Sequence, residues 1–177
     1  MKALEYYVKM KALQQLFVKK PANLSYLDGY FHYWGLHFEP KIDVPTKENQ
    51  LFNFIEGYKI PPYTEYLFYN IELLDQVFYE YEFATFAKIG TDYVSVKLET
   101  NQVMYVEFCD YHEMGLCAAS PEQFLDVMYL LAERDTMRVL GYGFETDDAV
   151  FLEKVIEASG DVGTTLFYRY ILSMLEN

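Results

Sequence analysis

The chain has 177 residues, a 52% share of hydrophobic residues and a formal net charge of −13. This length and composition exclude a disordered chain and allow one substantial core. Residues 21–177 hold nine basic and 26 acidic residues, a formal charge of −17. Direct nucleic-acid binding is therefore disfavoured, because such binding depends on cations meeting phosphates. A basic protein partner would be attracted to this charge, although acidity also serves solubility alone.

The location of the protein can be predicted from its apolar runs and cysteines. No run approaches the ~18 apolar residues of a membrane span. Lys9 and Lys11 interrupt the apolar stretch that a signal peptide would need. We therefore expect a cytoplasmic protein without membrane association, in which Cys109 and Cys117 are reduced thiols and form no disulfide.

The N-terminal third is predicted to contain one helix followed by irregular chain. Residues 3–18 favour helix by composition, but their apolar positions form no single stripe, so we expect a largely solvated helix in preference to a docked one. Glycine and proline break the aromatic segment 23–45, which predicts turns and short strands. Within it, His32, His37 and Glu39 lack a recognised metal-ligand spacing, and no metal site is predicted.

Two shorter patterns follow. Residues 46–58 predict a short helix with Thr46 as its N-cap. Residues 77–83 alternate in polarity, which predicts a half-buried strand with Glu80 and Glu82 on an acidic outer side. We do not interpret these two carboxylates as a catalytic pair, because alternate exposed acids are ordinary on strands.

The centre of the chain, Lys88 to Ala132, predicts two strands, a polar connection and a helix. Each strand has an apolar row at period two: Val94, Val96 and Leu98 in the first, and Met104, Val106 and Phe108 in the second. A three-residue turn over 100–102 would place both rows on one buried face, and we prefer it to an even-length turn. Asn101 or Gln102 would then take the positive φ that such a turn needs.

Three helices are predicted after this hairpin. The sequence Ser120-Pro121-Glu122-Gln123 is typical of a helix start, with Ser120 as the cap. The helix then presents an apolar side to the hairpin: Phe124, Leu125, Met128, Leu131 and Ala132. A second helix begins at Thr146 with Asp147 and Asp148, by capping and dipole complementarity, and ends at Gly160. The last, at about 164–175, has an apolar stripe that packs on the core or serves an interface: Leu166, Phe167, Tyr170, Ile171, Met174 and Leu175.

No enzyme is predicted, because the chain contains no established catalytic, nucleotide or cofactor motif. The nearest constellation is Asp110, His112, Glu113 and Cys117, between the hairpin and its helix. A Cys-His nucleophile needs hydrogen-bond reach and an oxyanion site, which this spacing does not establish. We interpret the segment as a polar loop with a cysteine near the helix start, and expect no cofactor.

Several segments carry a resemblance to a known family. They are Ile89 to Asp92 with the alternating strand after it, Gln102 to Val106, Leu116 to Leu125 and, more weakly, Gly57 to Pro61. On these residues the chain resembles the SUKH superfamily, over about 50–132. The resemblance implies one α+β domain over 1–177 with a mainly antiparallel sheet, to which the N-terminal helix and the C-terminal helices are extensions.

The resemblance also implies a binding function in which the protein catalyses no reaction. It predicts a bacterial immunity protein that binds and neutralises a toxin, commonly a nuclease, of a polymorphic toxin system. Our hypothesis for the surface that binds a basic toxin domain is a set of exposed acids: Glu80, Glu82, Glu99, Glu107, Asp110 and Glu113. The alternative is an acidic chaperone-like or scaffold dimer for a secreted or signalling partner, so a monomer and a homodimer both remain open.

Overall fold

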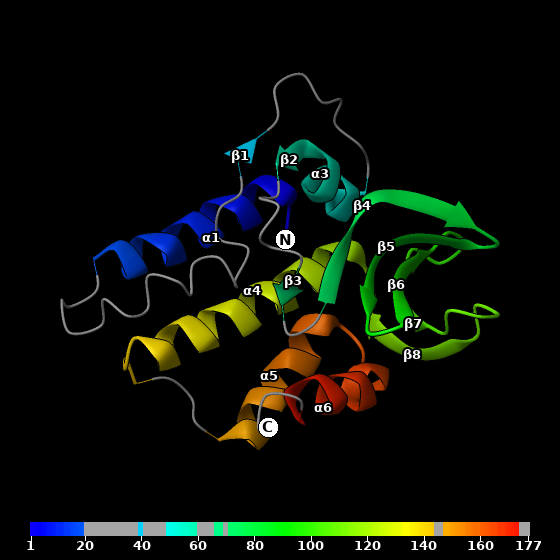
Figure 1. Ribbon diagram of the computed structural model, residues 1–177. Helices are drawn as coiled ribbons and strands as arrows, with labels where there is room; N and C mark the ends of the chain where they lie inside the picture. Colours follow the sequence, from blue (N-terminus) through cyan, green and yellow to red (C-terminus); the bar gives the residue numbers. More distant parts are fainter. Residues whose placement is uncertain (20–38, 41–48, 60–65, 69–70, 144–146, 174–177) are drawn as a thin grey trace.

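The computed structural model describes residues 1–19, 39–40, 49–59, 66–68, 71–143 and 147–173 (Figure 1). Its helices are α1 (Ala3–Val18), α3 (Gln50–Gly57), α4 (Pro121–Val139), α5 (Asp148–Ser159), the short 3₁₀ turn η2 (Val162–Thr164) and α6 (Thr165–Ser173). Its strands are β1 (Glu39–Pro40), β2 (Tyr58–Lys59), β3 (Tyr66–Phe68), β4 (Ile71–Glu80), β5 (Phe83–Ile89), β6 (Asp92–Lys97), β7 (Val103–Val106) and β8 (Glu113–Ala118).

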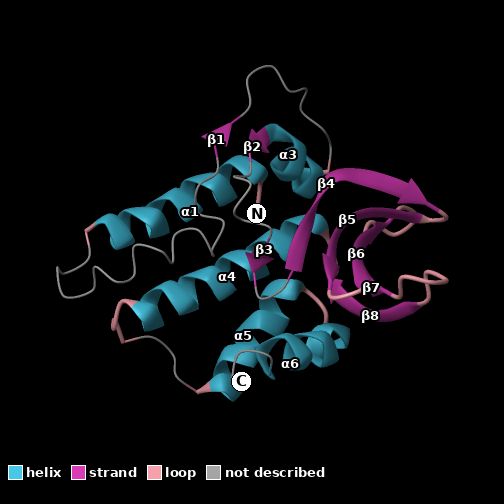
Figure 2. Cartoon of the chain, in the orientation of Figure 1, coloured by secondary structure: helices cyan, strands magenta, loops and turns pink. Residues whose placement is uncertain are grey.

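Strands β3 to β8 form one antiparallel sheet in chain order, and the helices gather on one side of it (Figure 2). This confirms the predicted α+β class. The face towards the helices carries a row of small and branched residues that stand opposite one another on β5 to β8: Ala84, Val96, Val103 and Ala118. All four are buried in the main core. We call the opposite side the outer face, and it has a smaller buried cluster of its own: Phe83, Met104, Val106 and Tyr111.

The predicted three-residue turn between β6 and β7 is wrong. Val96 stands opposite Val103, and the Lys97 amide donates to the Gln102 carbonyl at 2.8 Å, which leaves four residues between them. The two apolar rows therefore face opposite sides of the sheet. Both can be apolar because both faces are covered, a condition that the one-sided prediction did not include. Asn101 takes the positive φ, 58°, as one of the two predicted candidates.

The strand predicted over 77–83 is a hairpin. Strand β4 ends at Glu80, β5 begins at Phe83, and these two residues are cross-strand partners. Tyr81 and Glu82 form the tight turn, where Tyr81 has φ 51°. The turn contains none of the Gly, Asn, Asp or Pro residues that mark most hairpins, so the alternation concealed the reversal. Glu80 and Glu82 thus do not share the side of one strand.

The predicted polar connection before α4 contains another strand, β8. Its register with β7 shifts twice, between Val103 and Met104 and between Tyr105 and Val106. Such irregularities interrupt the period-two pattern, which is why the sequence did not reveal the strand. β8 is the last strand of the sheet, and its carbonyl at Cys117 accepts a hydrogen bond from the Tyr168 hydroxyl of α6 at 2.6 Å.

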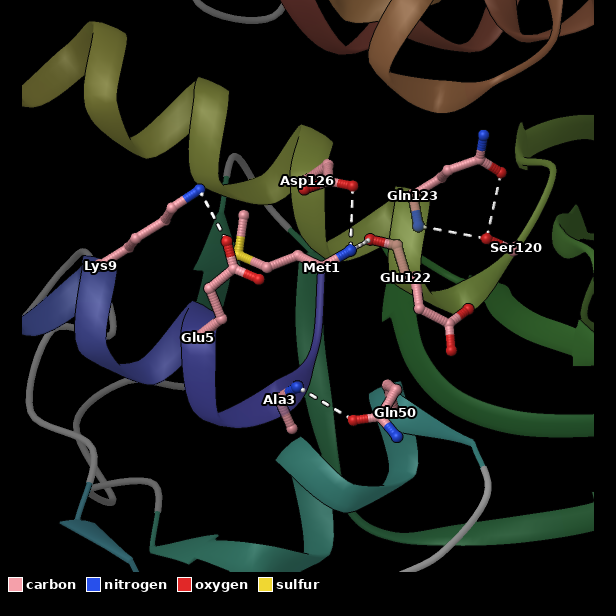
Figure 3. Close-up of polar contacts among 9 residues, drawn as sticks. All are labelled: Met1, Ala3, Glu5, Lys9, Gln50, Ser120, Glu122, Gln123 and Asp126. Atoms are coloured by element: carbon pink, nitrogen blue, oxygen red, sulfur yellow. Dashed lines mark hydrogen bonds and ion pairs between the residues drawn. The ribbon is translucent and has the colours of Figure 1, made fainter.

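Local capping accounts for where the helices begin. The Ser120 hydroxyl accepts from the Gln123 amide at 3.2 Å and donates to the Gln123 side-chain oxygen at 3.0 Å (Figure 3). The predicted start of α4 is confirmed, and its five predicted apolar residues are all buried. Asp147, one of the three residues predicted at the start of α5, caps it, and Gly160 ends it at φ 81° as predicted. Thr146 lies outside the described residues. Asn49 caps α3, while the predicted cap Thr46 lies outside the described residues.

Helix α1 is docked, so the expectation of a largely solvated helix is wrong. Tyr6, Met10 and Leu13 are buried at helical spacing in the main core, against α3 and α4. The Met1 amino group donates to the Glu122 carbonyl at 2.8 Å and pairs with the Asp126 carboxylate at 3.0 Å (Figure 3). Exposed apolar residues between the buried positions obscured this stripe in the sequence.

The stripe predicted on the last helix is divided between two sides of α6. Phe167 and Ile171 are buried as predicted, but Leu166 and Tyr170 are exposed. Tyr168 is buried in their place, because its hydroxyl bonds to the edge of the sheet. The remaining predicted members, Met174 and Leu175, lie outside the described residues.

Removing the hydroxyl should change the free energy of unfolding in opposite directions at two buried tyrosines. Tyr168 donates to Cys117, whereas Tyr6 has no hydrogen-bond partner for its hydroxyl within the described part of the chain. Tyr168→Phe should lower the free energy of unfolding by about 1–2 kcal/mol, because it leaves a buried carbonyl unsatisfied. Tyr6→Phe should leave the free energy unchanged or raise it by up to about 1 kcal/mol, since it removes an unsatisfied group. Urea denaturation of both variants tests this, and equal losses would contradict it.

Candidate functional site

A row of touching aromatic rings crosses the outer face. The Tyr81 and Tyr111 ring centroids are 5.3 Å apart, those of Tyr111 and Tyr93 5.6 Å, and those of Tyr93 and Phe108 5.4 Å. We call these four residues the aromatic row. Its centre at Tyr111 is buried, but Tyr81 is 79% and Phe108 52% exposed at its two ends. The row therefore presents two large apolar anchors to solvent.

Tyr111 is the residue that assembles the row. It belongs to the connection between β7 and β8, which folds over the outer face so that its ring stacks on Phe83 at 6.1 Å. Its hydroxyl donates to the Glu80 carboxylate at 2.9 Å. Burial, and next the bond to Glu80, raise the pKa of Tyr111, so this hydroxyl remains a neutral donor at physiological pH.

Tyr111 and its neighbour Tyr81 both have left-handed backbone conformations, at φ 57° and 51°. This conformation costs a bulky L-residue roughly 1–2 kcal/mol. Such local strain is retained where the surrounding structure compensates for it, and it is concentrated at functional sites. Two strained tyrosines in contact therefore single out this end of the sheet.

The structure places the six predicted acids on turns and strand ends of the same sheet. They are Glu80 at the end of β4, Glu82 in the following turn, Glu99 in the β6–β7 turn, Glu107 and Asp110 in the β7–β8 connection, and Glu113 at the start of β8. A bond from the Leu98 amide to the Glu82 carbonyl joins the first two turns. We call the row together with these acids the acidic aromatic surface.

Lys97 brings two of the predicted acids together. Its ammonium group lies 2.5 Å from Glu113 and 3.6 Å from Glu82. The hydrogen bond to Glu113 is the largest of the interactions that raise the pKa of Lys97, so this lysine stays charged to higher pH. The lysine thereby joins the first turn to β8 and has its charge neutralised within the surface.

The opposite end of the row retains uncompensated negative charge. The neighbouring Asp110 carboxylate is the largest cause of the raised pKa of Glu107, because an adjacent carboxylate disfavours ionisation of the glutamate. Nearby, Asp92 accepts from the Tyr105 hydroxyl at 3.1 Å and from the Phe108 amide at 3.3 Å. Residues 71–113 contain nine acids and two lysines, a formal charge of −7. Both lysines already pair with acids in this segment, so an added cation would be attracted here.

The alternative Cys-His site has unsuitable chemistry. Cys117 is fully buried, and burial raises the pKa of its thiol, which opposes formation of the thiolate nucleophile. His112 is exposed.

Across the described ranges no cluster of three or more His, Cys, Asp or Glu is arranged to hold a metal ion. His32 and His37 lie outside those ranges. No described helix is long and apolar enough to cross a membrane.

The sequence predicts the acids of this surface as a binding site but not its aromatic residues. The β7–β8 connection supplies Phe108 and Tyr111, and their rings reach Tyr93 and Tyr81 only because this connection folds back over the sheet. The one available signal was the large number of tyrosines, 18 in the chain. No family model, curated protein or solved structure matches this chain.

Proposed function

We propose that this chain is a binding protein that recognises a basic protein partner through the acidic aromatic surface. One observation carries the proposal: exposed aromatic anchors, Tyr81 and Phe108, lie on a face bordered by carboxylates. Interfaces between proteins are commonly built this way, with aromatic residues at the centre and polar groups at the rim. A few central aromatic residues then supply most of the binding free energy.

The resemblance to the SUKH superfamily supplies the class of partner. On that basis we propose a cytoplasmic immunity protein that neutralises a toxin of a bacterial polymorphic toxin system, commonly a nuclease. A nuclease must present cations to phosphates, and an acidic surface is complementary to such a site. The immunity protein would then act by covering the site and would perform no reaction itself.

The two parts of the surface should affect different rate constants. Long-range attraction by the acids raises the association rate, and this effect weakens as salt screens it. Burial of aromatic rings instead slows dissociation, because the contacts must be lost before the partners separate. This division allows the charge and the anchors to be tested separately.

The test partner is a basic nuclease toxin domain encoded beside this gene, where the neighbouring gene encodes one, with rates measured by surface plasmon resonance at low and physiological salt. Glu99→Lys with Glu107→Lys should slow association about tenfold at low salt and less at higher salt. Tyr81→Ala with Phe108→Ala should instead raise the dissociation rate at least about tenfold.

The matched control places the same charge change elsewhere. Glu153 and Glu157 are exposed on α5, and Glu153→Lys with Glu157→Lys should leave association nearly unchanged. Equal slowing by both pairs would mean that net charge alone acts and that the surface is wrongly placed. A toxin domain that does not bind the wild-type chain would contradict the proposed function.

A further inference from the structure

Helix α6 carries apolar side chains on the side that faces away from the core. Phe167, Tyr168 and Ile171 are buried, which is sufficient to dock the helix. Leu166 and Tyr170 of α6 are nevertheless 78% and 44% exposed, and Val162 in the preceding turn η2 is 80% exposed; we call these three residues the α6 stripe. A helix that packs only on its own domain ordinarily has polar residues on its outer side. The α6 stripe is therefore available for another molecule.

The α6 stripe is continuous with the acidic aromatic surface. The Tyr170 ring lies 6.4 Å from the ring of Tyr105 on β7. The Tyr105 hydroxyl donates to one oxygen of Asp92, and the other oxygen accepts from the amide of Phe108, the exposed end of the aromatic row. A chain of contacts through the Tyr105 ring and the Asp92 carboxylate thus connects Tyr170 of the stripe to the backbone of Phe108.

The charges beside the stripe indicate what it would bind. Asp92, Glu107 and Asp110 lie at one end, and Asp161 immediately precedes Val162. The exposed Arg169 of α6 is a single cation beside Tyr170, so the acids outnumber it. A complementary segment would have apolar side chains flanked by Lys or Arg. A second copy fits less well, because each copy carries a net charge of −13 and self-association would bring these acids together.

We propose that the α6 stripe binds a basic amphipathic helix of the same partner that the acidic aromatic surface recognises. This inference rests on the proposed function and extends it, since it assigns the partner a second, helical contact. Apolar residues of that helix would cover Val162 and Leu166, and its cations would pair with the adjacent acids.

The probe is a fluorescently labelled synthetic helix of about 16 residues, with leucines on one face and lysines on the other, in a low-salt anisotropy titration. Val162→Ser with Leu166→Ser should raise its Kd about tenfold or more, because burial of each side chain favours binding. Both positions are so exposed that folding should be unaffected. Leu4→Ser, at an exposed leucine on the distant helix α1, is the matched control and should leave the Kd unchanged (Figure 1).

Each outcome bears on the inference. A probe that fails to bind, or that binds the double variant as tightly as the wild type, would overturn it, and so would equal binding of a helix with glutamates for lysines. A wild-type dimer in light scattering that the double variant dissociates would reassign the stripe to a second copy. If the toxin binds and depends on Tyr81 and Phe108 but not on the stripe, only this inference fails. If the toxin does not bind, the proposed function fails.

Discussion

Replacing Phe124 by alanine is expected to lower the free energy of unfolding by about 3–5 kcal/mol. Phe124 is fully buried in the first turns of α4, and its ring meets that of Phe86 on β5 edge to face at 5.6 Å. The pair joins the central helix to the sheet, and truncation would leave a cavity that the close-packed surroundings fill only in part. Since domains of this size are stable by about 5–15 kcal/mol, the loss would be a large share. Urea denaturation measures it.

Two further variants make this prediction specific. Leu166→Ala, which truncates an exposed side chain, should change the free energy of unfolding by less than about 0.5 kcal/mol. Phe86→Ala with Phe124→Ala should cost less than the sum of the single losses, because the rings are each other's partners. A loss below about 1 kcal/mol for Phe124→Ala would show that α4 does not pack on the sheet as described.

The second large effect is expected at Arg134, where Arg134→Ala should cost about 3 kcal/mol because it truncates a large, fully buried side chain. This side chain is only 2% exposed on α4, forms an ion pair with Asp148 and lies over the Phe151 ring at 4.2 Å. Both contacts belong to α5, so the arginine joins the two helices. Thermal and urea denaturation of the variant measure the loss.

A methionine at the same position separates charge from packing. Arg134→Met keeps much of the apolar stem that packs beside Phe151, so its cost should be clearly smaller than that of alanine. Asp148 is 53% exposed and would remain hydrated after losing the arginine, which also limits the cost. Equal losses for methionine and alanine would assign the effect to the charge. Wild-type stability in both would contradict the structural role.

The proposed binding surface depends on contributions from distant parts of the chain. Glu80 holds Tyr111 in place, and Lys97 holds the turn at Glu82 against β8. Some of the acids that would attract a partner therefore also position the aromatic anchors. Glu99 and Glu107 form no ion pair with Lys97, which is why they were chosen for charge reversal.

Local signals in the sequence were reliable wherever neighbouring residues decide the structure. Ser120 and Asp147 begin their helices because each side chain can satisfy a backbone amide two or three residues ahead. Gly160 ends α5 because it readily adopts a positive φ. The alternating strands and the α+β class followed from side-chain periodicity in the same way.

Long-range pairing was the part that the sequence left open. The turn after Lys97, the reversal at Tyr81 and the irregular strand β8 were all mispredicted. In each case the choice depends on which face of a strand is covered, and a single strand does not contain that information. The docking of α1 on α4 likewise depends on a surface more than a hundred residues away.

The same distinction holds for the candidate site. By itself the sequence determined the chain's strong acidity and the six carboxylates proposed for binding, because charge is a property of each residue. Only the tertiary structure decided that Tyr81, Tyr111, Tyr93 and Phe108 form one row, and that Leu166 is exposed on α6. Such a surface forms through contacts between distant segments. Each helix or strand buries one of its sides in the core, and the residues on its other side are therefore exposed.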